Sequence, residues 1–572
     1  MKKQSVMIGA LAMASLLSAC SAKQTEKSMP TQAETQTQAA AESTQAAAET
    51  TQAAAEDTQV EAEAVAEEAQ PAEQGSALLA VDAINHYNYQ YIEVPEVDSN
   101  VMLDVEYMEL ALSEEDAARY PALQAALEAK NAAYQKEADT KKADLLANAT
   151  SELEEAKKEG QIQTYEDISR FDRSDCSEAE VVRADSRVLS YTNHFSAYSG
   201  GAHGMAGIYG YNLDPESGRE LTTEEVFKDR TQLADTLKCV ILEKYSAEEV
   251  CFLDDYLSYA SDVKSEYFTD YNFVLGNEGA IFYFNPYDIA PYASGMQCIA
   301  LAYREYEDLF KQDFTTLAEG YVEPMENDFE YRMHVNGNPD LDTLALAVSY
   351  GGDGYSEVYT LQVNGVETTL DDIIDAYSCK TYHVHTGEGD YIWLQTMGDN
   401  DYMLTYAYAI QDNRAVLTDY RNISRSGEYI SVDDQDDYKR MPAFNDPSAL
   451  TMDTRMYALG TYGGHKTYHV GEGGVPVSEN PWFTVSAGYD FPLTVIKAFT
   501  ARRVDEDGSV GDAFDIQVGD TVNVQRTDNE TFVDVLVNGQ DLVRLDYDNS
   551  DYPNKVCGED ENDLFEMIPY AG

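Results

Sequence analysis

The amino-acid sequence predicts an α+β region of antiparallel strands and helices, followed by a β-rich region. Alternating apolar and polar residues over 86–94 and 181–195 favour strands, and the stretch between them is typical of a long helix. From about Gly320 onward, Asn-Gly pairs such as Asn364-Gly365 separate apolar runs, which is a strong signal for β-hairpins. This change of pattern divides the folded part of the chain in two.

The N-terminus has the pattern of a bacterial lipoprotein signal. Lys2 and Lys3 precede an apolar run over 6–17, which is too short for a mature transmembrane helix and fits a signal peptide. The run ends in Leu-Ser-Ala-Cys20, which resembles a lipobox. We therefore predict a cell-membrane lipoprotein on the extracytoplasmic face, anchored only through the lipid on Cys20. The alternative is an ordinary secreted protein with an incidental cysteine.

Residues 21–76 are predicted to form a disordered tether. They are mostly Thr, Gln, Ala and Glu, and their short repeat supplies no Leu, Ile or Val for a coiled-coil seam. The predicted units are therefore a signal peptide (1–20), the tether (21–76), a first α+β domain (77–205), a second α+β domain (206–318) and a β-rich domain (319–572).

In the first α+β domain, strands are followed by a long helix. Ser113 and Asp116 form a capping pattern, and the helical stretch runs to about Lys158 and stops at Gly160. Pro121 must kink that helix or restart it. Residues 181–195 are then predicted as one strand that enters a loop with two adjacent glycines.

That loop reads Tyr198-Ser199-Gly200-Gly201-Ala-His203-Gly204, and the two glycines allow positive φ or a close backbone approach. His203 has three interpretations: a hydrogen-bonding plug, part of a recognition loop, or a catalytic histidine without a recognisable nucleophile.

The second domain continues with turn chemistry and short elements. Residues 212–218 form a turn, a helix starts at Thr222 or Thr223, and 271–284 reads as two strands across an Asn277–Gly279 turn. Tyr287 and Tyr292 are predicted as packing rings in the break before the last strand, at 296–303.

Three segments, 198–204, 211–221 and 284–295, occur in an order that resembles the paired extracellular domains of RsiV-type anti-sigma factors, which are lysozyme receptors, and of PdaC-type peptidoglycan deacetylases. The similarity covers about 83–316. It implies a cell-surface module that contacts the wall or the proteins that attack it. The separate metal-dependent domain of those deacetylases has no counterpart after Thr316, so the resemblance implies no catalytic residue.

The β-rich region contains an internal echo. Lys380-Thr-Tyr-His-Val384 recurs at 466–470, which suggests duplicated sheet units, propeller-like or sandwich-like. His383 and His385 alternate on one strand and point to the same face, and Glu388, Asp390 and His469 are the candidates to complete a metal site. Surface imidazoles are the favoured interpretation, and no metal or other cofactor is predicted.

The net charge of the chain restricts the classes of molecule that it can bind. With 104 acidic and 38 basic residues the net charge is −66, which excludes nucleic acid and is compatible with a cationic partner such as lysozyme, or with simple surface solvation. The acidic segments 433–437 and 505–512 lack the ligand spacing of a calcium loop. Six cysteines follow Cys20, and the sequence leaves disulfides and buried thiols equally open.

The predicted function is a non-catalytic surface module that binds peptidoglycan or a muralytic protein such as lysozyme. The predicted binding residues are Tyr198, Ser199, Gly200, Gly201 and His203, and no catalytic residue is predicted. Two alternatives remain: a wall-modifying hydrolase with an unrecognised site, and an accessory subunit of an exported complex.

Overall fold

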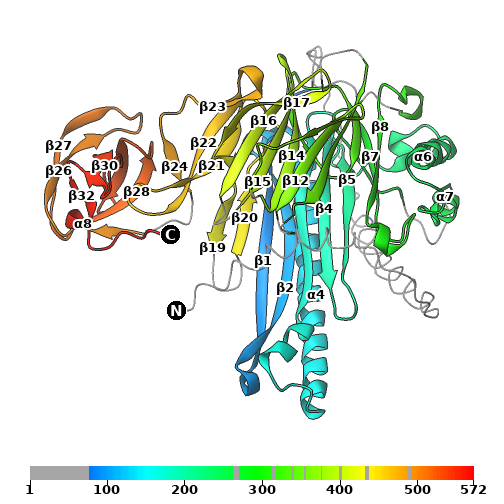
Figure 1. The fold of residues 1–572 in the computed structure, drawn as a ribbon, viewed down its shortest axis with the longest axis horizontal. Helices are drawn as coiled ribbons and strands as arrows, with labels where there is room; N and C mark the ends of the chain where they lie inside the picture. Colours follow the sequence, from blue (N-terminus) through cyan, green and yellow to red (C-terminus); the bar gives the residue numbers. More distant parts are fainter. Residues whose placement is uncertain are drawn as a thin grey trace, which may run out of the picture.

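The computed structural model gives the arrangement of the folded region (Figure 1). It describes residues 76–261, 270–311, 314, 317–335, 340–352, 354, 356–374, 376–398, 402–431, 437–486 and 491–571. The predicted lipidation site Cys20, the tether and most of the acidic segment 433–437 lie outside these residues.

The first sheet is built on a long hairpin, in which β1 (Val81–Val94) pairs with β2 (Ser99–Leu112) along its whole length. Tyr, Val and Ile residues alternate along these strands, so one side of the hairpin faces a core, as predicted. The sheet has seven strands, in the order β19 (Glu428–Ser431), β20 (Asp437–Met441), β1, β2, β3 (Arg173–Ala184), β4 (Leu189–Tyr198), β5 (Met205–Leu213).

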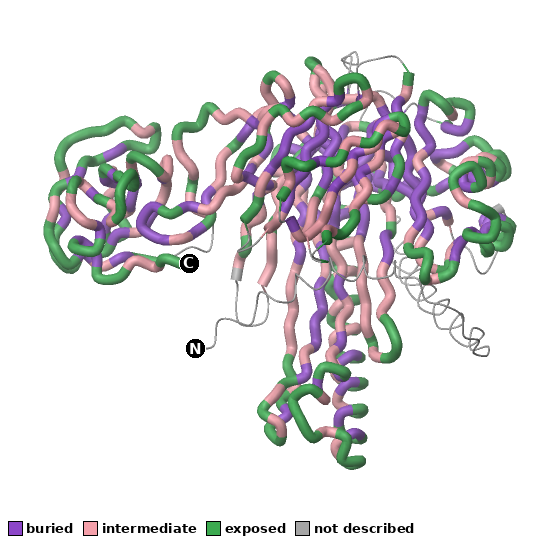
Figure 2. The backbone as a smooth tube through the Cα atoms, in the orientation of Figure 1, coloured by how far each residue is buried: buried purple, intermediate pink, exposed green. Residues whose placement is uncertain are grey.

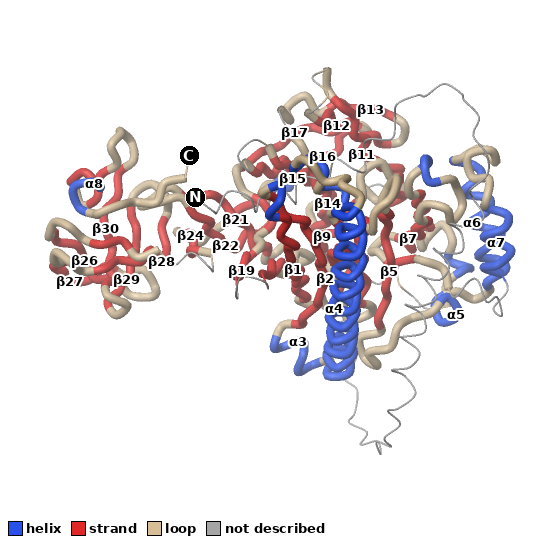
Figure 3. The backbone as a smooth tube through the Cα atoms, turned by 90° about the horizontal axis from the view of Figure 1, so that it is seen from below, coloured by secondary structure: helices blue, strands red, loops and turns tan. Residues whose placement is uncertain are grey.

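The predicted helix is present in two pieces, α3 (Glu114–Arg119) and α4 (Pro121–Lys158). The Ser113 hydroxyl accepts a hydrogen bond from the Asp116 backbone N–H at 3.1 Å, which caps α3. Pro121 starts α4 because proline fits the first turn of a helix. Helix α4 lies along β2 (Figure 3), and its buried positions include Leu123, Leu127, Leu145 and Leu153.

The prediction of one strand over 181–195 is wrong. The chain turns between β3 and β4, which pair with each other antiparallel. Asp185 makes the turn, because its carboxylate accepts hydrogen bonds from the Arg187 and Val188 backbone N–H groups. The apolar alternation continues through the turn, so the periodicity concealed it.

A three-stranded sheet follows, in the order β6 (Phe273–Leu275), β7 (Gly279–Phe284), β8 (Gln297–Ala302). Its strands and the turn at Asn277 agree with prediction. One face packs against α5 (Thr223–Val226), α6 (Arg230–Lys244) and α7 (Leu253–Ser261). The other face packs against β strands, so all six residues of β7 are buried.

Two further sheets lie against that second face. The four-stranded sheet is β10 (Glu330–Met333), β11 (Asp342–Tyr350), β12 (Glu357–Val363), β13 (Val366–Thr369). The five-stranded sheet is β17 (Arg414–Arg421), β16 (Met403–Gln411), β15 (Gly389–Met397), β14 (Ser378–Thr386), β9 (Tyr321–Met325). Asn364 and Gly365 have positive φ in the β12–β13 turn, as an Asn-Gly hairpin requires.

The C-terminal residues form a lobe set to one side (Figures 1 and 2). Its core contains only residues from Met456 onward. The largest sheet connects it to the rest, in the order β18 (Ser424–Arg425), β21 (Leu450–Met456), β22 (Tyr462–Val470), β24 (Phe483–Val485), β28 (Thr521–Thr527), β29 (Phe532–Val537), β30 (Asp541–Asp548), β26 (Phe499–Val504), β27 (Val510–Ile516). The short elements β25 (Leu493–Thr494), β31 (Lys555–Val556), β32 (Glu559–Asp560) and α8 (Glu561–Leu564) complete the lobe. The short strand β23 (Pro476–Val477) pairs with the end of β22 outside the lobe (Figure 1).

The described chain is therefore β-rich with few helices, and its sheets are open. The echo segments lie on β14 and β22, in different sheets, and Tyr382 and Tyr468 from them share one core. This face-to-face packing is consistent with the sandwich-like alternative.

At two of the predicted domain boundaries, the residues on either side pack against each other. The boundary at 205/206 lies at the β4–β5 hairpin, and one core includes residues from both sides of 318/319, such as Tyr283 and Tyr331. Independent folding of the units stays a prediction.

The six cysteines in the described residues are free thiols, and Cys176 and Cys298 are buried. Among these residues, no helix is long and apolar enough to cross a membrane.

Candidate functional site

The predicted binding loop joins β4 to β5 at the end of the first sheet. Gly200 and Gly201 have φ of +97° and +103°, a conformation that L side chains rarely adopt, so the predicted need for glycine is confirmed. The Tyr198 hydroxyl donates to the Gly201 carbonyl at 3.2 Å and closes the turn. Ser199 and His203 are exposed.

The buried side chain of Arg173 lies against this loop, next to Gly200. The Arg173 guanidinium donates to the carbonyl oxygens of Arg170 and Asp172 at 2.9 and 2.8 Å and pairs with Glu152 of α4. A Cβ on Gly200 would lie only 2.9 Å from Arg173 Nη2, so a larger residue there would displace this guanidinium. Nothing in the sequence around Arg173 indicated this role.

The segment 285–295 meets the loop from the neighbouring sheet. The Tyr292 hydroxyl donates to the Gly204 carbonyl at 2.9 Å. The His203 ring stacks on the Tyr292 ring, with 4.2 Å between centroids and 29° between planes. The structure therefore brings the first and third motif segments together.

Tyr287 extends this stack. Its backbone has φ of +77°, which is unusual for a bulky residue and marks a locally strained loop. The ring is 46% exposed and its centroid is 5.8 Å from that of Tyr292. His203, Tyr292 and Tyr287 thus form a row of rings at the surface, which we name the aromatic platform.

Three asparagine side chains fix the two halves of the site to each other. The Asn285 amide binds both the N–H and the C=O of Ile208 on β5, at 2.8 and 3.1 Å. Asn272 and Asn212 make equivalent contacts farther along β5, to Gly210 N–H and to the Phe273 carbonyl. We call this set the asparagine clamp.

Glycines on β5 make room for the clamp. A Cβ on Gly207 would lie 2.4 Å from Asn285 Oδ1, and one on Gly210 would lie 2.5 Å from the Phe273 carbonyl oxygen. The two sheets are therefore joined by side-chain amides where no backbone ladder links the described strands. Sequence reasoning missed the clamp, because single asparagines in a strand or next to one have no distinctive spacing.

The second motif segment lies elsewhere. The Asp214 carboxylate accepts from Ser217 N–H at 2.7 Å in a tight turn. A Cβ on Gly218 would lie 2.3 Å from the Ala122 carbonyl oxygen of α4. This segment therefore packs against the start of α4 after β5 ends, and it takes no part in the platform.

The chemistry around His203 does not resemble a catalytic arrangement. Its Nδ1 hydrogen-bonds the Gly204 carbonyl at 3.0 Å. Burial raises the pKa of Asp288 to about 6, but its carboxylate accepts from the Asn285 backbone N–H at 2.7 Å, which is a structural role. In the described residues no hydrogen bond or ion pair joins His203 to an acid.

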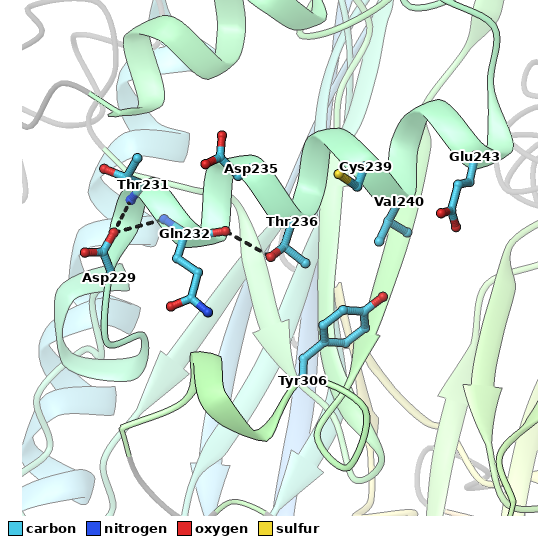
Figure 4. A pocket seen from close by; sticks show the side chains of 9 residues that line it. All are labelled: Asp229, Thr231, Gln232, Asp235, Thr236, Cys239, Val240, Glu243 and Tyr306. Carbon is cyan, nitrogen blue, oxygen red and sulfur yellow. Dashed lines mark hydrogen bonds between the residues drawn. The ribbon is translucent and has the colours of Figure 1, made fainter.

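One surface groove lies apart from the platform and has none of its residues in the lining. It has a volume of about 750 Å³ and runs along α6 beside Tyr306 (Figure 4). The Asp229 carboxylate caps α6 at its rim by accepting from Thr231 and Gln232 N–H at 2.8 and 2.9 Å. Asp235 and Glu243 also line the groove, so it is open and acidic.

His383 and His385 both contact Asp390, at 3.0 and 2.7 Å from its Oδ1. This pairing holds the pKa of Asp390 near 2, although burial acts against it. No hydrogen bond or ion pair adds Glu388 or His469 to the group in the described part of the chain. His383 is fully buried, so it is not the surface imidazole that was predicted.

Part of the chain is similar to a protein family whose function is unknown. Residues 224–304 match the family described as "Protein of unknown function (DUF3298)". A DUF3298-family structure from Bacteroides fragilis is 21% identical, with a TM-score of 0.31, over 42% of this chain and 96% of that one. Another, from Pseudomonas aeruginosa, is 14% identical, with a TM-score of 0.25, over 41% and 96%.

No curated protein matches the chain. The matched residues include Tyr287 and Tyr292 of the platform, whereas His203 lies before them. The chain thus contains a DUF3298 domain at residues 224–304.

Proposed function

We propose that this chain is a bacterial cell-surface lipoprotein whose α+β module binds a cell-wall polymer or a muralytic protein such as lysozyme, without catalysis. The observation that carries the proposal is the aromatic platform, in which His203, Tyr292 and Tyr287 lie in a row on two loops. Exposed rings offer apolar faces with polar edges, which suit both sugar rings and protein interfaces.

The glycan is the ligand that the platform favours. The Tyr287 ring is 46% exposed and lies beside the stacked His203–Tyr292 pair, so it offers an apolar face to a sugar ring. The net charge of −66 instead favours a basic protein, through long-range attraction. The two ligands are therefore expected to differ in salt dependence.

The test is a sedimentation assay with purified peptidoglycan and a binding assay with lysozyme, using wild type, His203→Ala and Tyr287→Ala. Loss of a platform ring is expected to cost about 1–2 kcal/mol, or roughly five- to thirtyfold in Kd. Tyr420→Ala is the matched control, because Tyr420 is a 60% exposed ring on β17, in another sheet.

The salt dependence of binding then distinguishes the two ligands. Binding through ring stacking changes little as ionic strength rises, whereas binding through net charge weakens steeply. If wild type binds neither ligand at micromolar concentration, or if the platform variants bind as well as Tyr420→Ala, the proposal is wrong.

A further inference from the structure

A separate cluster of possible metal ligands lies in the first sheet. Asp104 and Glu106 alternate on β2 and so share a face, and Cys176 lies on β3. Each offers one ligand atom, a carboxylate oxygen or Sγ, and these atoms all lie within 4.8 Å of one another. The three residues are buried, with exposed fractions of 6%, 5% and 3%.

The carboxylates are incompletely satisfied. Asp104 Oδ1 and Glu106 Oε2 are buried and have no hydrogen-bond partner. The Tyr89 hydroxyl reaches the other Glu106 oxygen only at 3.5 Å, which is a weak contact. Two acids, Asp104 and Glu178, act on Glu106 with the same sign of charge. Buried carboxylates normally have a cation or donor beside them.

We propose that Asp104, Glu106 and Cys176 bind a divalent transition-metal ion, with Zn²⁺ the best fit. Zinc accepts both thiolate and carboxylate ligands, whereas Mg²⁺ and Ca²⁺ prefer oxygen alone. Neighbouring donors of a tetrahedral zinc site lie roughly 3.6 Å apart, so the present side chains need to approach by about 1 Å. Glu178 follows Cys176 by two residues on the same face of β3 and is a candidate for a fourth ligand.

The position gives such an ion a structural role. β2 and β3 are paired in parallel only from Leu103↔Arg173 to Val105↔Asp175. Cys176 is the next residue of β3, where this short ladder ends. A metal held by both strands would extend their connection beyond the last backbone pair, and Arg173 under the platform loop lies on the same strand.

The test is titration of the purified, reduced and metal-free full chain with Co²⁺ and Zn²⁺. A thiolate-to-cobalt charge-transfer band in the ultraviolet is expected for wild type. Zn²⁺ is expected to displace cobalt and to raise the thermal unfolding temperature. Cys176→Ser should lose the band, and Cys298→Ser should keep it, because Cys298 is a buried thiol in another core.

Glu106→Gln covers the case in which Cys176→Ser fails to fold. It keeps the thiol and the side-chain shape, so it is expected to retain the cobalt band at saturation with at least tenfold weaker Zn²⁺ affinity. Absence of both the band and the thermal shift in wild type overturns the proposal. A band that persists in folded Cys176→Ser also overturns it, because another thiolate, such as that of the exposed Cys239 or Cys251, then binds the cobalt.

Discussion

Glu180 connects three distant parts of the sequence, and its charge is predicted to hold them together. Its carboxylate pairs with Lys380 of β14 at 2.8 Å and with Arg425 of β18. The side chains of Glu180 and Arg425 are only 10% and 7% exposed. Although burial acts against the charge, these two cations hold the pKa of Glu180 near 2, well below its usual 4.5.

This difference in pKa sets the size of the effect of Glu180→Gln. From 4.5 to about 2 it corresponds to about 3 kcal/mol, at 1.36 kcal/mol for each pH unit. Because the folded-state pKa is depressed, the stabilisation is complete above the unfolded pKa and is lost as the pH falls through the folded pKa. The variant is therefore expected to be about 3 kcal/mol less stable than wild type at pH 7 and only about 1 kcal/mol less stable at pH 3.

Urea unfolding followed by tryptophan fluorescence measures this difference. Trp393 is fully buried in a core with Tyr382 and Phe444, and Arg425 lies over the Phe444 ring at 5.5 Å. Trp482→Phe removes the other tryptophan, so the signal comes from this core. The matched control is Glu154→Gln, whose surface pair with Lys158 is expected to contribute less than about 0.5 kcal/mol. A stability difference that stays constant between pH 7 and pH 3 would refute the reasoning.

Three other predictions follow from single positions. Cys20→Ala is expected to abolish lipidation and release the chain from membranes, and normal fractionation of that variant would contradict the lipoprotein prediction. Gly207→Ala should clash with Asn285, lower stability by about 1–3 kcal/mol and reduce peptidoglycan or lysozyme binding, as measured by unfolding and sedimentation. Val535→Ala, in the C-terminal lobe, should lower the stability of that lobe by about 2 kcal/mol and leave the Trp393 transition unchanged; a shift in both transitions would show one cooperative unit.

Local signals in the sequence predicted the elements that they encode directly. The Ser113 cap, the helix start at Pro121 and the Asn364-Gly365 turn are set by neighbouring residues, and all three are present. The turn between β16 and β17 was not predicted, because Asp412 and Asn413 adopt positive φ there without a glycine. The turn between β3 and β4 was not predicted for a related reason, because a single aspartate, Asp185, makes it within an apolar alternation.

Pairings between distant segments could not be predicted. β20 pairs with β1 although more than 300 residues separate them, and no local pattern records that contact. The same limit applies to the site. The glycines and His203 were identified from the loop sequence, whereas Tyr287 and Tyr292 were interpreted as packing rings because nothing in their neighbourhood indicates the stack with His203.

The asparagine clamp explains how a surface formed by two sheets can act as one site. Asn285 precedes the loop that carries Tyr287 and Tyr292, and it binds Ile208 on the strand that follows the His203 loop. Each half of the platform is therefore fixed to β5 within a few residues of its rings. A binding surface gains affinity when its rings are held in place before the ligand arrives, since less motion is lost on binding. The need for Gly207 beneath Asn285 and the strained backbone of Tyr287 are then parts of one arrangement, in which local strain is offset by the clamp.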